Sequence, residues 1–210
     1  FLMNASPNPE IFSNLKSLKS LKMVIAGVDD PQFFKALEPL PLKILHIRFS
    51  KPAIFTQIVA QSLSEALFFK AGIEEFSFSL KVTPQQHIRL VADMISSFPD
   101  IKRLFIDETI YLDLFYRELN LKSNLTHLSI KVEISKQNEF NSFSNAFSKQ
   151  VELTELRLEI NSRDAQFFKE VMNHMKKMIL LKQLQIILGP RCLFVNFKDF
   201  IEILKNFKQL

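Results

Sequence analysis

The chain is poor in the residues that make tight turns and cross-links. Among its 210 residues there are three Gly, two Tyr, one Cys and no Trp. Glycine supplies the positive φ angles of two-residue hairpins, so its scarcity disfavours a barrel or sandwich with many hairpins. The single Cys192 excludes an internal disulfide framework and is typical of a reducing compartment. We therefore expect an intracellular protein, cytoplasmic or nuclear.

The signatures of catalysis and of membrane insertion are absent as well. No stretch approaches the roughly 18 uninterrupted apolar residues of a membrane span. There is no Gly-rich phosphate loop and no nucleophile elbow, and the four His lack the spacing of metal ligands. The sequence therefore predicts a protein that is not an enzyme and that has no cofactor, no metal and no small-molecule substrate.

Apolar and charged residues are both abundant. They make up 47% and 23% of the chain, as in a folded protein. The 22 Phe indicate either a long apolar seam or a codon bias that also favours Lys, Ile and Asn. The 27 basic and 22 acidic residues leave a formal charge of +5. The basic residues are spread along the whole length, whereas a nucleic-acid binder usually concentrates them on one face.

The informative pattern is an internal repeat. An apolar residue, two variable residues, a second apolar residue, one variable residue and a third apolar residue recur seven times. The triplets are Leu18, Leu21, Met23; Leu42, Leu45, Ile47; Ile73, Phe76, Phe78; Ile101, Leu104, Ile106; Leu125, Leu128, Ile130; Leu153, Leu156, Leu158; and Leu181, Leu184, Ile186. The intervals between repeats are 24 to 31 residues.

This spacing predicts one short strand in each repeat. The second and third apolar residues lie two apart, so they point to the same side of a strand. One such unit cannot bury its apolar edge alone, but stacked units form a parallel sheet covered on one face by the segments between strands. We expect strands centred on the middle apolar residues, namely Leu21, Leu45, Phe76, Leu104, Leu128, Leu156 and Leu184.

The segments between the strands have helical periodicity. Residues 164–180 and 54–67 each place apolar side chains along one face of a helix. Asp30-Pro31 and Thr83-Pro84 have the form of an N-cap followed by proline at the first helical position. Three Phe pairs lie in these segments, and we expect core packing for Phe33-Phe34, Phe68-Phe69 and Phe167-Phe168. The alternative is that one Phe of each pair points outward and forms an apolar stripe for a partner.

Residues 15–210 combine short strands with helical returns. They resemble the leucine-rich-repeat family, and the ribonuclease-inhibitor-like subgroup in particular. The resemblance implies an α/β horseshoe solenoid of about seven repeats of 24–31 residues, with parallel strands on the concave side and helices on the convex side. The family usually has Asn, Cys or Thr three residues after the third apolar position. Here only Asn161 and Thr109 match, and Ser50 is tolerable, so we expect an irregular, divergent solenoid.

The domain organisation expected is a single solenoid segment over residues 1–210. Residues 1–14 read as a loop-like start, and residues 207–210 read as the first half of a further repeat. Because the pattern breaks off inside a repeat and the chain starts at Phe1, we expect a fragment of a longer protein.

The variable strand positions define a candidate partner-binding face. It comprises Lys22, His46, Arg48, Glu75, Arg103, Phe105, Asp107, Lys131, Glu155, Arg157 and Glu159. Two interpretations stay open. The charges could pair across neighbouring strands, as Lys131 and Glu159 could, since strands lie about 4.8 Å apart. Alternatively, they form a mixed-charge docking face with Phe105 as its apolar anchor.

The expected function is a non-catalytic scaffold or adaptor that presents this surface to a protein partner in a larger assembly. The alternative is an RNA-associated component of a ribonucleoprotein that uses the basic early repeats, notably Lys22, His46 and Arg48. The acidic residues interleaved on the same face favour the protein partner, because a groove that tracks phosphates would be uniformly basic.

Overall fold

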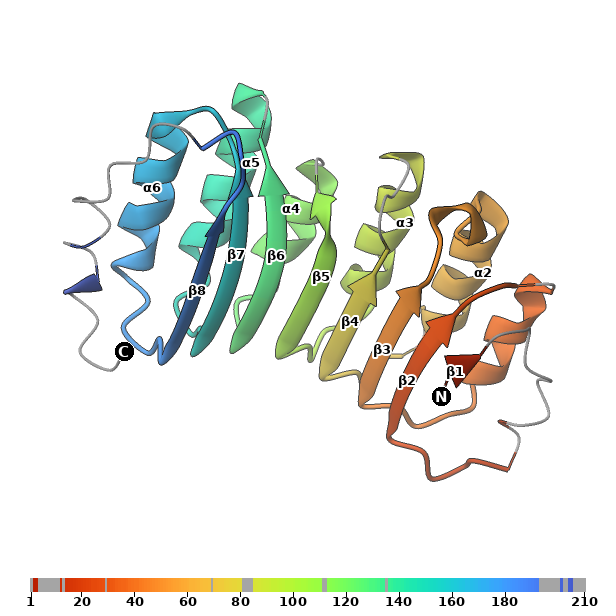
Figure 1. Cartoon of the computed structure of the whole chain (residues 1–210). Helices are drawn as coiled ribbons and strands as arrows, with labels where there is room; N and C mark the ends of the chain where they lie inside the picture. The colour runs from red at the N-terminus through yellow and green to blue at the C-terminus, as the bar shows by residue number, and fades with distance from the viewer. Residues whose placement is uncertain are drawn as a thin grey trace. The chain divides into compact units, whose positions relative to one another are not determined.

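Each of the seven apolar triplets contributes to a β-strand in the computed structural model (Figure 1). The structure describes residues 2–3, 12, 14–28, 30–68, 70–80, 85–110, 113–134, 136–192, 201 and 204–205. The predicted strands are β2 (Ser20–Ile25), β3 (Ile44–Phe49), β4 (Glu75–Ser79), β5 (Arg103–Ile110), β6 (His127–Glu133), β7 (Glu155–Asn161) and β8 (Gln183–Leu188). The strand positions predicted from the sequence are confirmed.

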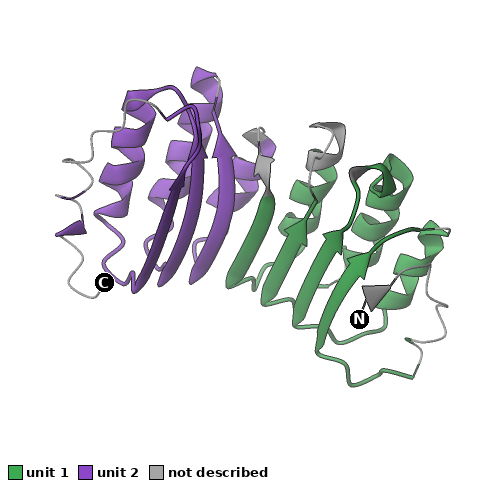
Figure 2. Cartoon of the chain, viewed as in Figure 1, with its two compact units in different colours: residues 1–108 green, residues 109–210 purple. Residues whose placement is uncertain are grey.

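The chain forms two compact units (Figure 2), the first over Phe1–Glu108 and the second over Thr109–Leu210. In the first unit β2, β3, β4 and β5 pair in sequence order, all parallel, and β6, β7 and β8 do the same in the second. The register aligns the repeats as the sequence predicts. Leu21, Leu45, Phe76 and Leu104 are successive partners, and so are Leu128, Leu156 and Leu184.

Helices alternate with the strands and lie on one side of them in each unit (Figure 1). They are η1 (Pro31–Leu37), η2 (Pro52–Ile54), α2 (Gln57–Leu67), α3 (Gln85–Ser96), α4 (Asp113–Asn120), α5 (Gln137–Ser148) and α6 (Ala165–Met175). The prediction of an α/β fold with parallel strands and helical returns is therefore confirmed at this level.

The helix starts follow local capping chemistry. The Asp30 carboxylate accepts the N–H of Gln32 at 2.9 Å, and Pro31 follows it, as predicted. The helix that starts here is a 3₁₀-helix, not an α-helix. Asp164 caps α6 by accepting N–H groups from Gln166 and Phe167. The second predicted cap, Thr83-Pro84, lies outside the described residues.

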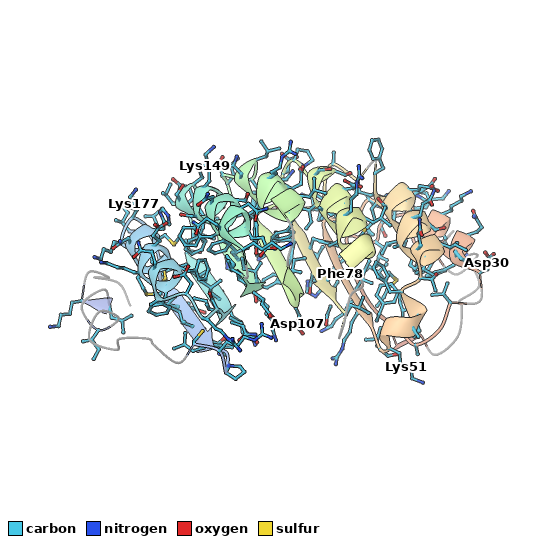
Figure 3. The ribbon with its side chains drawn as sticks, turned by 90° about the horizontal axis from the view of Figure 1, so that it is seen from above. Asp30, Lys51, Phe78, Asp107, Lys149 and Lys177 are labelled. Carbon is cyan, nitrogen blue, oxygen red and sulfur yellow. The ribbon has the colours of Figure 1, made fainter. Side chains whose placement is uncertain are left out.

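Alternation along each strand separates a helix-facing side from an open side. In β2 to β4 and in β6 and β7, the second and third apolar residues of each triplet are buried, while the residues between and beside them are exposed or half-buried. Figure 3 shows the difference in the first unit, where Phe78 lies between strands and helices and Asp107 lies on the side away from the helices. We call the side without helices the open face.

Phenylalanine fills much of each core. In the first unit the rings of Phe49, Phe55 and Phe78 pack with centroids 4.8 to 6.0 Å apart. Of the predicted core pairs, Phe33, Phe34, Phe167 and Phe168 are buried. Phe68 is the exception: it is 61% exposed at the end of α2, and its neighbour Phe69 lies outside the described residues.

A further buried position recurs three residues before the first apolar residue of a repeat. Its occupants are Lys70, Phe98, Lys122, Gln150 and Met178, and all are buried. The Lys70 ammonium donates to the carbonyls of Glu38 and Leu40 in the preceding turn, and Gln150 Nε2 donates to the carbonyls of Leu119 and Ala146. Burial lowers the pKa of Lys70 and of Lys122 below the usual lysine value. Lys70 and Gln150 therefore satisfy carbonyls that the ends of preceding turns leave open.

The ends of the chain lie largely outside the described residues. Within the expected loop-like start, Leu2–Met3 forms the short strand β1, parallel to β2, which the sequence did not predict. Residues 207–210, the expected start of a further repeat, are not among the described ones. In the described part of the chain, no helix has the length and apolar character needed to cross a membrane.

Candidate functional site: the open face of the strands

All eleven residues of the predicted partner-binding face lie on the open face of their strands. The first unit carries Lys22, His46, Arg48, Glu75, Arg103, Phe105 and Asp107, and the second carries Lys131, Glu155, Arg157 and Glu159. The strand backbone fixes their Cα positions. Each group therefore forms columns of side chains that run across neighbouring strands. No helix of the described chain lies between these side chains and solvent within either unit.

In the first unit, Glu75 is at the centre of a cluster drawn from three strands. Its Oε1 lies 2.6 Å from Nε2 of His46, and its Oε2 lies 2.6 Å from Nε of Arg103. The Glu75 side chain is only 13% exposed because its neighbours cover it. The ring of Phe105 stands 6.5 Å from that of His46, centroid to centroid. We call His46, Glu75, Arg103 and Phe105 the Glu75 cluster.

A second charge network runs along the edge where the strands begin. Glu74 accepts from Lys43 at 2.6 Å and lies 3.4 Å from Lys102, and the three residues share one position of successive repeats. The hydrogen bond and charge of Glu74 raise the pKa of Lys43, and the two lysines lower the pKa of Glu74. Sequence reasoning missed this network, although its alternating charges at one repeat position were a readable signal. Glu74 and Glu75 each have their own basic partners and do not form a carboxylate pair.

In the second unit, the predicted cross-strand pairing is confirmed. Lys131 Nζ lies 2.6 Å from Glu159 Oε1, and His127 Nε2 lies 3.1 Å from Glu155 Oε1. Each pair joins β6 to β7 at directly opposed positions of the register. All four residues are half-buried at the surface. Ion pairs near solvent, such as Lys131–Glu159, contribute about 0–1 kcal/mol, so they order the surface more than they stabilise the fold.

Two arginines of the predicted face remain outside these networks. Arg48 is exposed in β3 between Val24 and Ser79, and Arg157 is exposed in β7 between Ser129 and Gln185. Neither forms a salt bridge with any described residue. Arginine is the basic residue most enriched where interfaces concentrate their binding energy. Arg48, Arg157 and the half-buried Phe105 are therefore the side chains best placed to contact a partner.

The histidines do not converge. His46 and His127 each meet a glutamate on the open face, His174 lies on α6, and the side chain of His87 is outside the described ones. Among the described residues, no group of three His, Cys, Asp or Glu could hold a metal ion. The described geometry thus offers a surface of ordered side chains.

His174 gives the second unit a pH dependence that can be measured. Ser144 Oγ lies 2.7 Å from its Nε2 and 3.2 Å from Glu170 Oε2, while Nδ1 is buried without a hydrogen-bond partner in the described chain. Burial, with the charge of Lys177, lowers the pKa of His174 below 6.5. Just below pH 6.5 the unfolded chain therefore binds more protons than the folded chain.

We predict that acidification destabilises the wild type more than a His174→Gln variant. The stability tied to His174 is complete above pH 6.5 and is lost as pH falls toward the lowered pKa of the folded state. One proton gives a ceiling of about 1.4 kcal/mol per pH unit, and partial solvent access keeps the effect below it. Denaturant unfolding at several pH values measures it, and equal slopes for both proteins would contradict the assignment.

Comparisons with known proteins give no family for this chain. No protein-family model matches it, and no curated protein matches it significantly. A function is therefore inferred from the strands, their register and the side chains of the open face.

Proposed function

We propose that this chain is a divergent leucine-rich-repeat protein of the ribonuclease-inhibitor-like type that acts as a non-catalytic scaffold inside the cell. Its open face binds a protein partner. The repeat register supports the family proposal, and so does Asn161, which occupies the position where the family has Asn. The Asn161 Oδ1 accepts the backbone N–H of Arg191 at 3.3 Å, and its Nδ2 donates to Glu133 at 3.2 Å.

The observation that carries the functional proposal is the order of the open face. The Glu75 cluster and the Lys131–Glu159 pair hold charged side chains in set positions across neighbouring strands. Side chains that are already ordered lose less conformational entropy when a partner binds. A mixture of both charges with an aromatic ring and available arginines is the composition of a protein-binding surface.

Site-specific photo-crosslinking tests this proposal. A benzophenone side chain in place of Phe105 should form covalent adducts with a discrete protein partner from cells that express the chain, because Phe105 is on the open face. The matched control places the same group at Phe68, an exposed phenylalanine on the helix side. Arg48→Glu should weaken the adduct at position 105 about tenfold or more, since it reverses a charge at the interface. Adducts of equal yield at both positions would exclude the open face as the binding surface.

The same crosslinking samples, with a salt titration, distinguish a protein partner from RNA. Binding to RNA would neutralise phosphates, so its affinity would fall steeply between low and moderate salt. We expect no such binding, because Glu74, Glu75 and Asp107 are interleaved with the basic residues of the first unit. Adducts at position 105 that contain RNA, together with a steep salt dependence, would favour the ribonucleoprotein role instead.

A further inference from the structure

The second unit contains a cavity of about 460 Å³ beyond the ends of β6 and β7. This volume lies within the range of small-ligand sites. Ile134 and Phe140, both nearly buried, supply the apolar part of its lining, and Asn161 and Ser162 supply polar groups. The cavity is distinct from the eleven residues of the open face.

Three basic residues line this cavity, each from a different repeat. Lys136 precedes α5, Arg163 precedes α6, and Arg191 follows β8. They are spaced 27 and 28 residues apart, which matches the repeat interval. Because neighbouring strands lie about 4.8 Å apart, equivalent turns bring three long basic side chains to one edge of the unit. Arg163 and Arg191 lie five residues after the third apolar residue of their repeats, and Lys136 lies six residues after its own. At the five-residue distance the four earlier repeats have, in place of a basic residue, Val28, Pro52, Thr83 and Tyr111.

The acidic groups around the cavity are already engaged. The Asp164 carboxylate accepts two N–H groups at the start of α6, and the Glu139 carboxylate accepts the backbone N–H of Lys136 at 3.2 Å. Glu133 pairs with Arg191 and with the amide of Asn161. Within the described residues, Lys136 and Arg163 have no acidic partner, so their charge is available to a ligand.

The turn that carries Arg191 is held in place by close packing. Gly189 N donates to Ile160 O at 2.7 Å, and a Cβ at Gly189 would lie 2.7 Å from Asn161 Oδ1. The backbone N–H of Arg191 donates to that same oxygen, and Cys192 Sγ donates to Ile160 O at 3.2 Å. The turn and the Asn161 side chain thus form a preorganised wall, which limits the entropy lost on binding.

We propose that this cavity binds a phosphate monoester, in addition to any partner on the open face. Cationic side chains from three separate turns suit a tetrahedral dianion, whose oxygens point in several directions. A planar carboxylate is satisfied by one arginine fork. Phosphate groups can reach the site on a free metabolite or on a phosphorylated side chain of another protein, and both offer the same chemistry to Lys136, Arg163 and Arg191.

Titration of the full chain at constant ionic strength tests the proposal. The probes are inorganic phosphate, O-phosphoserine, a phosphoserine peptide and glutamate. Calorimetry measures the binding of each probe. We expect saturable binding of the phosphate probes and at least tenfold weaker binding of glutamate. If O-phosphoserine binds as tightly as the peptide, the natural ligand is a free metabolite. If the peptide binds more tightly, the natural ligand is a phosphorylated side chain of another protein.

Matched variants locate the binding. Lys136→Gln and Arg163→Gln should each weaken O-phosphoserine about tenfold, the loss expected for one charge-assisted hydrogen bond. Lys149→Gln is the control, because Lys149 is exposed at the opposite end of α5 (Figure 3) and should change the affinity less than twofold. Both substituted cavity residues are exposed, so circular dichroism should show intact folding. Lack of saturable phosphate binding, equal affinity for glutamate, or equal losses in all three variants would overturn the proposal.

Discussion

Leu128→Asp is expected to cost the second unit about 4 kcal/mol or more, enough to unfold much of it at neutral pH. Leu128 is 1% exposed in the middle of β6, and Leu156 is its register partner in β7. The substitution removes a buried apolar side chain and places a carboxylate among apolar groups with no cation to pair with. Typical domains have only about 5–15 kcal/mol of stability in total, so the loss takes most of it.

Amide hydrogen exchange measures this effect residue by residue. We expect protection to fall in β6 and β7, whose backbone hydrogen bonds depend on the packed side of the strands. The control is Leu121→Asp, the same change at a leucine that is 71% exposed in the same unit. It should cost less than about 1 kcal/mol, because it buries no charge. Similar losses for the two variants would mean that β6 is not packed against the helices as the structure shows.

The strand positions could be predicted because their signal is local and strictly spaced. Two apolar residues two apart, preceded by one three residues earlier, specify both the strand and the side that is buried. The register then follows from stacking equivalent repeats, which is why Lys131 and Glu159 could be named as a pair and are found 2.6 Å apart. The face that carries the candidate partner residues was readable for the same reason.

The type of the first helix could not be predicted from its start signal. Asp30 and Pro31 start a 3₁₀-helix as readily as an α-helix, because both need the same cap. The first interval between repeats is 24 residues, against 31 for the next. The length of the return does not decide the helix type, because the interval from Ile101 to Leu125 is also 24 residues and contains the α-helix α4.

Features built from several repeats at once escaped prediction. Lys70, Lys122 and Gln150 read as surface residues by type, yet they are buried at one repeat position that Phe98 and Met178 fill elsewhere. The basic residues of the phosphate cavity are each unremarkable in their own turn. Only the stacking of β6, β7 and β8 makes neighbours of Lys136, Arg163 and Arg191. A search at a fixed repeat offset would have found the first set, but not all of the second, because Lys136 lies one residue further from its apolar triplet than Arg163 and Arg191 do.

Phe143→Ala is expected to lower the stability of the second unit by about 3–5 kcal/mol. Phe143 is fully buried on α5, where its ring packs against Tyr116 at 5.3 Å, Phe147 at 5.1 Å and Phe167 at 5.4 Å. These partners come from α4, α5 and α6, so one side chain joins three helices that pack on the strands of this unit. Its removal leaves a cavity that a close-packed interior cannot fully close.

Denaturant unfolding of the variant, followed by tyrosine fluorescence and by circular dichroism, checks this expectation. Phe68→Ala is the matched control, because it deletes the same ring at a site that is 61% exposed, and it should cost less than about 1 kcal/mol. Tyr116 is one of two tyrosines in the chain and lies against Phe143, so its emission should report the loss directly. If Phe143→Ala and Phe68→Ala destabilise equally, the aromatic packing of α4, α5 and α6 does not hold the second unit together. A large loss confined to Phe143→Ala would show that the phenylalanines the sequence has in excess stabilise the helices that cover the strands.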